Sequence, residues 1–368
     1  MTGTTTVPGG AALALARESL WRAVRDGDEY AAGRAVFTAL DDGAGPEDVL
    51  LGVIAPVQHK VGLEWAADRF TVAQEHAATA IHERIIAAVG HHSRTAAPPP
   101  KAPRVTVACV DGEWHALPAR LLAEVLRHRG YQVDFLGAQV PTRHLIADLH
   151  RTAPAAVALS SSLPVRLPAA HTAITAVQAT GVPVLVGGAA FGTDGRHARL
   201  LGADAWAPDA AAAADILAKG LPRPAPGAVR QGVEDLPHLI DQEYTLVLRG
   251  RRQLVRNTLS GLRERLPAMR AYTDAQAERT AEDVAHIVDF LACALYTDDS
   301  RLFTGFLDWT GDVLEARQVP AMVLDPALAL LQDELKDFPR ASDFLAQGRS
   351  ALRARGTRSS VPGPRHDV

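Results

Sequence analysis

Apolar residues recur at helical spacing along the N-terminal part of the chain. Side chains three and four residues apart share one face of a helix, so this pattern predicts helices that bury one side. The predicted helices are Ala11–Arg25, Glu29–Asp41, Pro46–Asp68 and Thr71–Gly90. Because short turns join them, we expect residues 11–92 to form a four-helix bundle.

Short β-rich runs alternate with helical stretches in the middle of the chain. The predicted strands are Val105–Val110, Gln132–Leu136, Ala155–Ser160, Val182–Val186 and, more weakly, Ala203–Ala207. Helices such as Pro118–Arg129 and Pro168–Thr180 fit between them. This alternation predicts parallel strands joined by right-handed crossovers. We therefore expect a doubly wound, flavodoxin-like (Rossmann-like) α/β domain over residues 103–220.

The last block is wholly helical from about Leu236 to Ala354, with Pro267 and Pro320 as interruptions. We expect an all-α domain over residues 232–356. Proline-rich segments at 93–104 and 220–227 cannot continue a helix and are expected to separate the three domains. Residues 357–368 have the composition of a disordered tail.

Composition narrows the class of protein. The chain has 368 residues, is 47% hydrophobic and carries a net charge of −4, which gives no general attraction to nucleic acid. Cys109 and Cys293 are too few for a disulfide framework, which fits a reducing cytosol. The N-terminus lacks the layout of a signal peptide, and no apolar run would span a bilayer. We expect a cytoplasmic protein with no membrane partner.

Three short motifs follow three of the predicted strands, where parallel sheets bind ligands. Gly112 permits a sharp turn, and a neutral imidazole at His115 is a good ligand for cobalt. Glu113 is placed to accept a hydrogen bond from the other ring nitrogen. The motifs are Asp111-Gly112-Glu113-Trp114-His115 with Leu117, Ser161 with Leu163, and Gly187-Gly188.

In this order the motifs resemble the cobalamin-binding signature of corrinoid proteins, in which a histidine replaces the cofactor's own base beneath cobalt. The resemblance implies His115 as the cobalt ligand and the other motif residues as contacts to the cofactor and its nucleotide tail. The chain departs from the family at Pro118, where glycine is usual. Proline suits the first turn of the following helix.

Within the bundle, Trp65 precedes Glu75-His76 by nine intervening residues. This spacing resembles the signature of cobalamin-dependent photoreceptors, whose helical cap covers the cofactor. The resemblance implies that Trp65 packs over the 5′-deoxyadenosyl group and that Glu75 and His76 contact it. The bland alternative is a core tryptophan and a solvated Glu-His face. The DNA-binding members carry a histidine that captures cobalt after photolysis where this chain has Ala66, so a bis-histidine adduct is not expected here unless His76 or His82 substitutes. Nothing before Ala11 would supply a helix-turn-helix, so we expect no direct DNA binding.

The C-terminal block resembles the globin-like, bilin-binding domain of photocobilins. The resemblance is carried by domain order and by the stretch from Glu282 through His286 and Tyr296 to Phe303. It implies noncovalent biliverdin rather than a thioether at Cys293. A bilin needs an apolar slot, polar groups and cations. The candidate contacts are Arg252, His286, Tyr296 and Trp309. Haem on a histidine, or a docking module without a chromophore, is the alternative.

Together these features predict a photoreceptor rather than an enzyme. It would hold adenosylcobalamin and biliverdin, form a homo-oligomer and regulate a separate effector protein, such as an enzyme. The alternative is a corrinoid methyl carrier for a methyltransferase system, which would use the same His115. A mutase fits less well, because no stretch of the chain would build a substrate barrel.

Overall fold

The computed structural model describes residues 10–92, 99, 101–224 and 236–359. The chain divides into two compact units, one up to Arg230 and one from Gln231 onward. The proline-rich residues 93–98, 100 and 225–227 lie outside the described residues. The predicted disordered tail begins too early at residue 357, because the last helix continues through residues 357–359. Residues 360–368 lie outside the described part.

The first unit begins with the helical cap. Its elements are α1 (Gly10–Arg25), α2 (Glu29–Asp41), α3 (Pro46–Val49), the π-helical turn η1 (Leu50–Ile54), α4 (Ala55–Ala66) and α5 (Val72–His92). The predicted third helix is therefore one rod, α3–η1–α4, with a π turn inside it. The guanidinium of Arg17 donates to the carbonyl oxygen of Gly52 in that turn, at 3.0 and 2.8 Å. This bond ties α1 to the irregular turn.

A five-stranded parallel sheet follows the cap, in the order β2-β1-β3-β4-β5. The strands are β1 (Arg104–Cys109), β2 (Gln132–Gly137), β3 (Ala156–Ser160), β4 (Val184–Gly187) and β5 (Ala205–Ala207). The predicted strands are confirmed to within a few residues. β4 begins two residues late, after Pro183, which has no N–H for the ladder.

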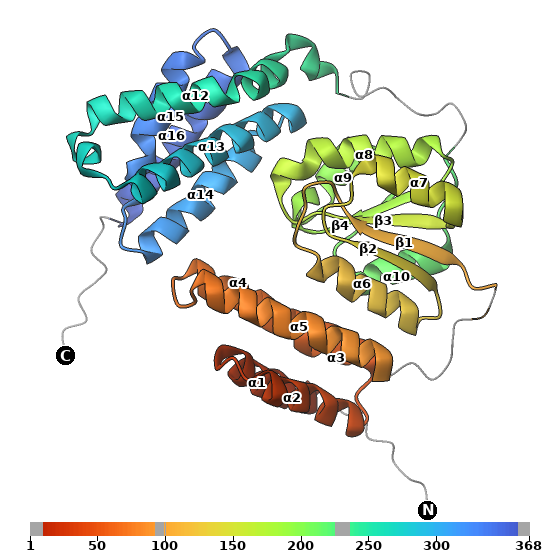
Figure 1. The fold of residues 1–368 in the computed structure, drawn as a ribbon. Helices are drawn as coiled ribbons and strands as arrows, with labels where there is room; N and C mark the ends of the chain where they lie inside the picture. Colours follow the sequence, from red (N-terminus) through yellow and green to blue (C-terminus); the bar gives the residue numbers. More distant parts are fainter. Residues whose placement is uncertain (1–9, 93–98, 100, 225–235, 360–368) are drawn as a thin grey trace, which may run out of the picture. The chain divides into compact units, whose positions relative to one another are not determined.

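Helices cover both faces of the sheet. α6 (Leu117–His128) and α10 (Ala210–Lys219) pack together on one face, whereas α7 (Thr142–Thr152) and α8 (Leu167–Ala179) pack together on the other (Figure 1). The short α9 (Arg196–Leu200) contacts β5. This is the expected doubly wound fold. Its strand order reverses between β1 and β3, and such a switch point opens a crevice at the carboxyl ends of these strands.

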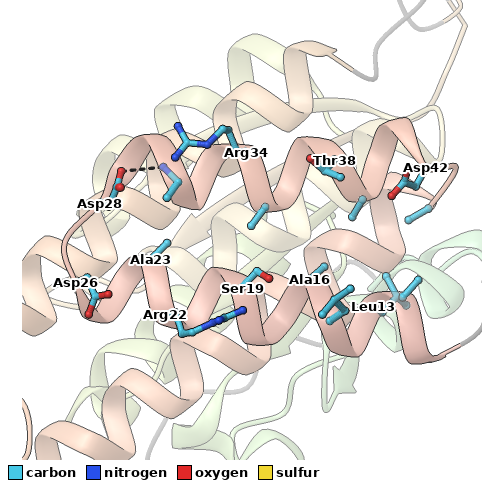
Figure 2. A pocket seen from close by; sticks show the side chains of 16 residues that line it. Leu13, Ala16, Ser19, Arg22, Ala23, Asp26, Asp28, Arg34, Thr38 and Asp42 are labelled. Atoms are coloured by element: carbon cyan, nitrogen blue, oxygen red, sulfur yellow. Dashed lines mark hydrogen bonds between the residues drawn. The ribbon is translucent and has the colours of Figure 1, made fainter.

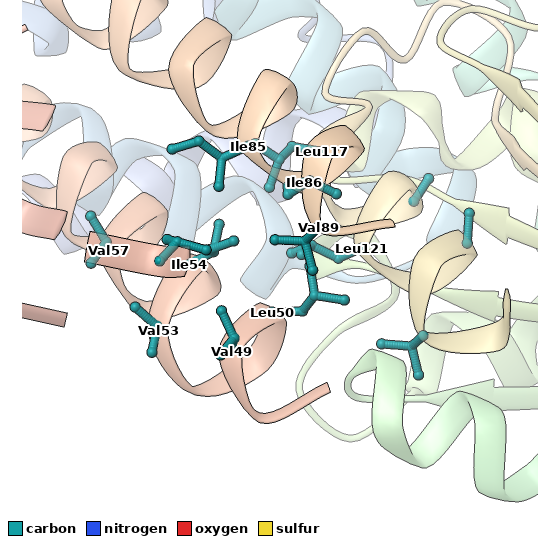
Figure 3. Packing of buried hydrophobic residues seen from close by; sticks show 14 of the residues in the cluster. Val49, Leu50, Val53, Ile54, Val57, Ile85, Ile86, Val89, Leu117 and Leu121 are labelled. Atoms are coloured by element: carbon teal, nitrogen blue, oxygen red, sulfur yellow. The ribbon is translucent and has the colours of Figure 1, made fainter. Parts of the chain in front are cut away.

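The cap and the sheet domain share one hydrophobic core. Figure 3 shows Ile86 of α5 beside Leu117 of α6, and Leu50 of η1 near Val89 of α5 and Leu121 of α6. α5 approaches α6 so closely that a Cβ on Gly90 would lie 2.5 Å from a carboxylate oxygen of Glu124. The two helices are therefore closely packed against each other.

Ion pairs also hold the cap to the sheet domain. Arg129, which follows α6, donates to Glu47 of α3 at 3.0 and 2.6 Å. The same guanidinium pairs with Asp215 of α10. One arginine therefore joins the cap to two helices of the sheet domain.

The second unit is all-α around its own core. Its helices are α12 (Glu243–Arg265), α13 (Asp274–Thr297), α14 (Ser300–Ala316), α15 (Asp325–Glu334) and α16 (Pro339–Ser359), with the short turns η4 (Pro237–Asp241), η5 (Pro267–Ala271) and η6 (Ala321–Leu324). Pro267 and Pro320 interrupt the pattern as predicted. Its relation to globins stays a prediction.

Among the described residues, no helix combines the length and the apolar character needed to cross a bilayer.

Candidate functional site

The site centres on Glu113, which is fully buried in the turn between β1 and α6. One carboxylate oxygen, Oε1, accepts hydrogen bonds from the backbone N–H of His115 at 2.9 Å and from its Nδ1 at 2.7 Å. The other, Oε2, accepts from the backbone N–H groups of Ser162 and Leu163, at 2.7 and 2.9 Å, and from Ser161 Oγ at 3.2 Å. One carboxylate therefore joins the turns after β1 and β3.

The hydrogen-bond donors around Glu113 determine its charge. Burial alone would raise its pKa, but hydrogen bonds from the His115 side chain and from the His115, Leu163 and Ser162 N–H groups lower it to about 2. The carboxylate is therefore ionised at neutral pH although no water reaches it.

This carboxylate fixes which nitrogen of His115 is available. An ionised acceptor at Nδ1 requires a proton there, so Nε2 keeps its lone pair for a metal. The His115 side chain is 40% exposed, so it is accessible to a ligand, and its ring lies 4.5 Å from that of Trp114. The predicted role of Glu113 as hydrogen-bond acceptor is confirmed.

Cys109, at the end of β1, contacts the same turn. Its Sγ lies 3.8 Å from the carbonyl oxygen of His115. Burial and the nearby Glu113 carboxylate raise the pKa of this thiol to about 12. Cys109 therefore stays protonated and acts as a donor.

Two glycines make the close approach of the strand ends possible. Gly112 has φ of +75°, which produces the predicted sharp turn. Gly188 has φ of +100°, and a Cβ there would collide with the backbone carbonyl oxygen of Ser161. The absence of a side chain at Gly188 therefore allows the backbone that follows β3 to lie close to the end of β4. At Gly187, a Cβ would lie 3.2 Å from the carbonyl oxygen of Ala207.

The other predicted residues of this edge differ in exposure. Asp111 and Trp114 are exposed, and Leu163 is half-buried. Leu117 is buried in the core that α6 shares with the cap (Figure 3). Pro118 lies in the first turn of α6, as its sequence position predicts.

In the cap, Glu75 is one end of a chain of hydrogen bonds between α4 and α5. His82 Nδ1 lies 2.6 Å from Gln58 Oε1, Gln58 Nε2 donates to Thr79 Oγ1 at 2.8 Å, and Thr79 Oγ1 donates to Glu75 Oε1 at 2.9 Å. The other Glu75 oxygen accepts from His76 Nδ1 at 2.5 Å. Glu75 is therefore held from both sides, whereas Trp65 is half-buried against the core at the end of α4.

His82 is the buried end of this chain. It is fully buried, and its Nε2 has no hydrogen-bond partner among the described residues. Burial lowers the pKa of its imidazole to about 4, so it is neutral at pH 7. The sequence pattern singled out His82 only as a substitute ligand, and it missed Gln58 and Thr79. The spacing of Glu75, Thr79 and His82 along one face of α5 was the available signal.

A hollow of about 730 Å³ lies between α1 and α2 (Figure 2). Small side chains such as Ala16, Ala23 and Ala39 line it, with Arg22 and Arg34 at its rim. It contains none of the predicted cobalamin residues, so it is not part of the candidate site.

In the second unit, two of the predicted bilin residues, His286 and Tyr296, lie far apart on α13. Arg252, His286 and Trp309 are exposed. Tyr296 stacks edge-on against Tyr244, and it lies about 15 Å along α13 from His286 by the rise of a helix. Between α13 and α14, Phe290 and Phe306 stack with ring centroids 3.8 Å apart. A half-buried aromatic stack is thus present between these two helices.

The residues at the sheet edge suit a corrinoid. A corrin ring brings its own nitrogen ligands, so the protein needs to add only one imidazole, and Nε2 of His115 is available for such a contact. Among the described residues, no group of three or more His, Cys, Asp or Glu side chains is arranged to hold a free metal ion.

Comparison with known proteins agrees with this site. Residues 103–215 match the B12 binding domain family, and residues 16–89 match a second model that is also described as a B12 binding domain. The fold, the site and these two matches define a cobalamin-binding protein.

The chain is also 31% identical over 149 residues to the HTH-type transcriptional repressor CarA of Myxococcus xanthus. This match covers 39% of the chain and 47% of the repressor, so the chain spans about half the length of this curated relative.

Two solved structures are similar to parts of the chain. The monomethylamine corrinoid protein of Methanosarcina barkeri has 18% identity and a TM-score of 0.46, over 55% of this chain and 97% of that one. A cobalamin-binding protein from Desulfitobacterium hafniense has 20% identity and a TM-score of 0.31, over 54% and 96%.

Replacing Glu113 by alanine should destabilise the first unit by roughly 2–4 kcal/mol, because buried N–H donors lose their acceptor. Urea unfolding at pH 7 measures this loss. The control is Asp111→Ala, an exposed carboxylate in the same turn, which should change the free energy of unfolding by less than about 0.5 kcal/mol. Equal stability of the two variants would contradict the role of Glu113.

His82 should make stability depend on pH. Its pKa is about 4 in the folded state, below the ordinary 6.5, so its contribution is complete above pH 6.5 and is lost as the pH falls toward 4. At pH 5 the expected loss is about 2 kcal/mol relative to pH 8.

The measurement is urea unfolding of the wild type and of His82→Leu at both pH values. The variant should lose this part of the pH dependence, whereas the exposed His76→Gln control should keep it. An unchanged pH dependence in His82→Leu would show that His82 is not the group responsible.

Proposed function

We propose that this chain is a cytoplasmic light-sensing regulatory protein that holds adenosylcobalamin between its helical cap and the edge of the sheet. His115 is the lower cobalt ligand, and Trp65, Glu75 and His76 contact the adenosyl group above. The remaining residues of the strand-end motifs surround the cofactor and its nucleotide tail. The observation that carries the proposal is the fixed Glu75 carboxylate in the first turn of α5, together with the half-buried Trp65 near the end of α4.

The state of Glu75 argues against a solvated helix face. A free surface carboxylate would turn to water, yet Glu75 accepts bonds from Thr79 and His76 and is only 27% exposed. Such a group is preorganised to bind the hydroxyl groups of a ribose, because its rotamer is already set. A methyl group has no hydroxyl to offer, so this arrangement favours an adenosyl over a methyl ligand.

The light response follows from the shared core. When bound, adenosylcobalamin supplies a cobalt–carbon bond that visible light breaks. Trp65 would then lose the group it packs against, and α4 and α5 would repack. Because Ile86 of α5 and Leu117 of α6 belong to one core, the change reaches the turn that carries His115.

We propose that the light signal is passed on through an interaction with another protein. The chain would act as a homo-oligomer and regulate a separate effector protein, without direct contact to DNA. CarA is a transcriptional repressor, and its similarity to this chain supports a regulatory rather than an enzymatic role. Because Ala66 stands where the DNA-binding photoreceptors have a histidine, the upper cobalt ligand after photolysis would differ from theirs.

For the second unit we propose noncovalent binding of biliverdin. The stacked Phe290 and Phe306 offer an aromatic surface, and the exposed Trp309 lies one turn from Phe306 along α14. His286 lies one turn before Phe290 on α13 and would supply a polar contact. Arg252 is an exposed cation on α12 and would meet a propionate, whereas Tyr296 is too far along α13 to join His286.

Green light should remove the adenosyl group from the cobalamin that is bound in the dark. The test is the absorption spectrum of dark-purified, adenosylcobalamin-loaded protein before and after illumination. We expect the corrin bands to shift with green light. A light-stable corrin that carries methyl or water would instead favour the methyl carrier.

Glu75 should discriminate between upper ligands. In Glu75→Gln, we expect the preference for adenosylcobalamin over methylcobalamin to fall about tenfold, since a charged hydrogen-bond acceptor is lost. Glu83→Gln, an exposed residue of the same helix, is the matched control and should bind as the wild type does. The dissociation constants of both cofactors, measured in the dark, give the ratio. An unchanged ratio in Glu75→Gln would sink the adenosyl assignment.

Biliverdin supplied to the full chain should add a far-red band to the spectrum. Trp309→Ala should weaken this binding by about tenfold, because the substitution removes an exposed aromatic ring that biliverdin would pack against. Tyr272→Ala, also exposed in the second unit, is the control. If no band appears beyond those of the corrin, the unit is a docking module.

A further inference from the structure

We propose that Arg166 binds the phosphodiester group in the nucleotide tail of cobalamin, so that the protein selects complete corrinoids over forms without a nucleotide. The inference rests on the cobalamin site described above and names a further contact within it.

Arg166 stands between the two turns that form the site. It ends the short turn η2 (Pro164–Arg166), directly after the Ser161–Leu163 segment that donates to Glu113. Its guanidinium lies against the bare Cα of Gly112. A Cβ there would be 2.8 Å from Nη1 and 2.9 Å from Cζ. Glycine at position 112 therefore makes room for this cation as well as for the turn.

The Arg166 guanidinium has an unsatisfied donor that a ligand would satisfy. Its Nε is buried and makes no hydrogen bond, and no ion pair of its guanidinium is found within the described part of the chain. Arg129, by contrast, is paired with Glu47 and Asp215. A buried donor without an acceptor is unfavourable, so an anion that supplied one would be bound well.

The local charge also favours an anion. Glu113 is the buried carboxylate of this site, but the N–H groups of its two turns and His115 already occupy both of its oxygens. In addition, α6 and α8 begin at this edge, at Leu117 and Leu167, so their partly positive ends face the same region. The guanidinium thus keeps its positive character.

The chemistry of the cofactor identifies the anion. The amide side chains around a corrin ring are neutral, and the phosphodiester of the nucleotide tail is the one anionic group of cobalamin. When His115 takes the lower face of cobalt, this tail is displaced and must run past the turns after β1 and β3. A guanidinium presents two parallel N–H donors to two phosphate oxygens, which makes arginine well suited to this contact.

The experiment compares cobalamin with cobinamide, which lacks the nucleotide, on the full chain. In Arg166→Gln we expect cobalamin to bind roughly ten- to a hundredfold more weakly and cobinamide to bind as it does to the wild type. Arg166→Lys keeps a charge but loses the fork, so its loss should be intermediate. Arg151→Gln is the control, because this arginine lies at the end of α7, away from the carboxyl ends of the strands.

Three results are decisive against the inference. Equal weakening of both corrinoids in Arg166→Gln would make Arg166 a support of the turn, and no weakening of either would remove its role altogether. If the glutamine variant does not fold, a lysine variant with wild-type cobalamin-to-cobinamide preference would contradict the phosphate contact. A wild-type protein that binds neither corrinoid would instead contradict the cobalamin site itself.

Discussion

The buried carboxylate of Glu113 is the constraint on which the rest of the site depends. An ionised group without solvent is tolerated only when donors surround it, and here they come from two separate turns. This need fixes the turn after β1 against the turn after β3. It also fixes the tautomer of His115, because a carboxylate at Nδ1 demands a proton there. The same constraint explains why position 188 is a glycine, since any side chain there would push the turn after β3 away from its place.

The cap repeats this design on a smaller scale. A line of side-chain hydrogen bonds sets Glu75, and it ends at the neutral, buried His82. The cap and α6 share one core, so the upper and lower parts of the site belong to one packed body. Repacking of Trp65 would therefore reach the helix that follows His115. The proposed signal needs no hinge, only two ways of packing the same core.

Much of the first unit is predictable from sequence because its patterns are local. Hydrophobic periodicity gives the cap helices and strands, and the order of the strand-end motifs gives the site with His115 and Glu113. The backbone donors at Ser162 and Leu163 are not predictable, because every residue carries an N–H and only the fold selects two. Gln58 and Arg166 were missed for a similar reason, since their roles depend on how separate elements pack. In the second unit, His286 and Tyr296 cannot both contact one bilin group as predicted, because the helical rise between them separates them along α13.

The central claim is that Glu113 holds His115 as the lower ligand of cobalt. Electron paramagnetic resonance of the Co(II) form, in protein grown with ¹⁵N-labelled histidine, tests it most directly. We expect the labelled imidazole to split each cobalt line into a doublet. A triplet, from the unlabelled nitrogen of the cofactor's own base, would contradict it.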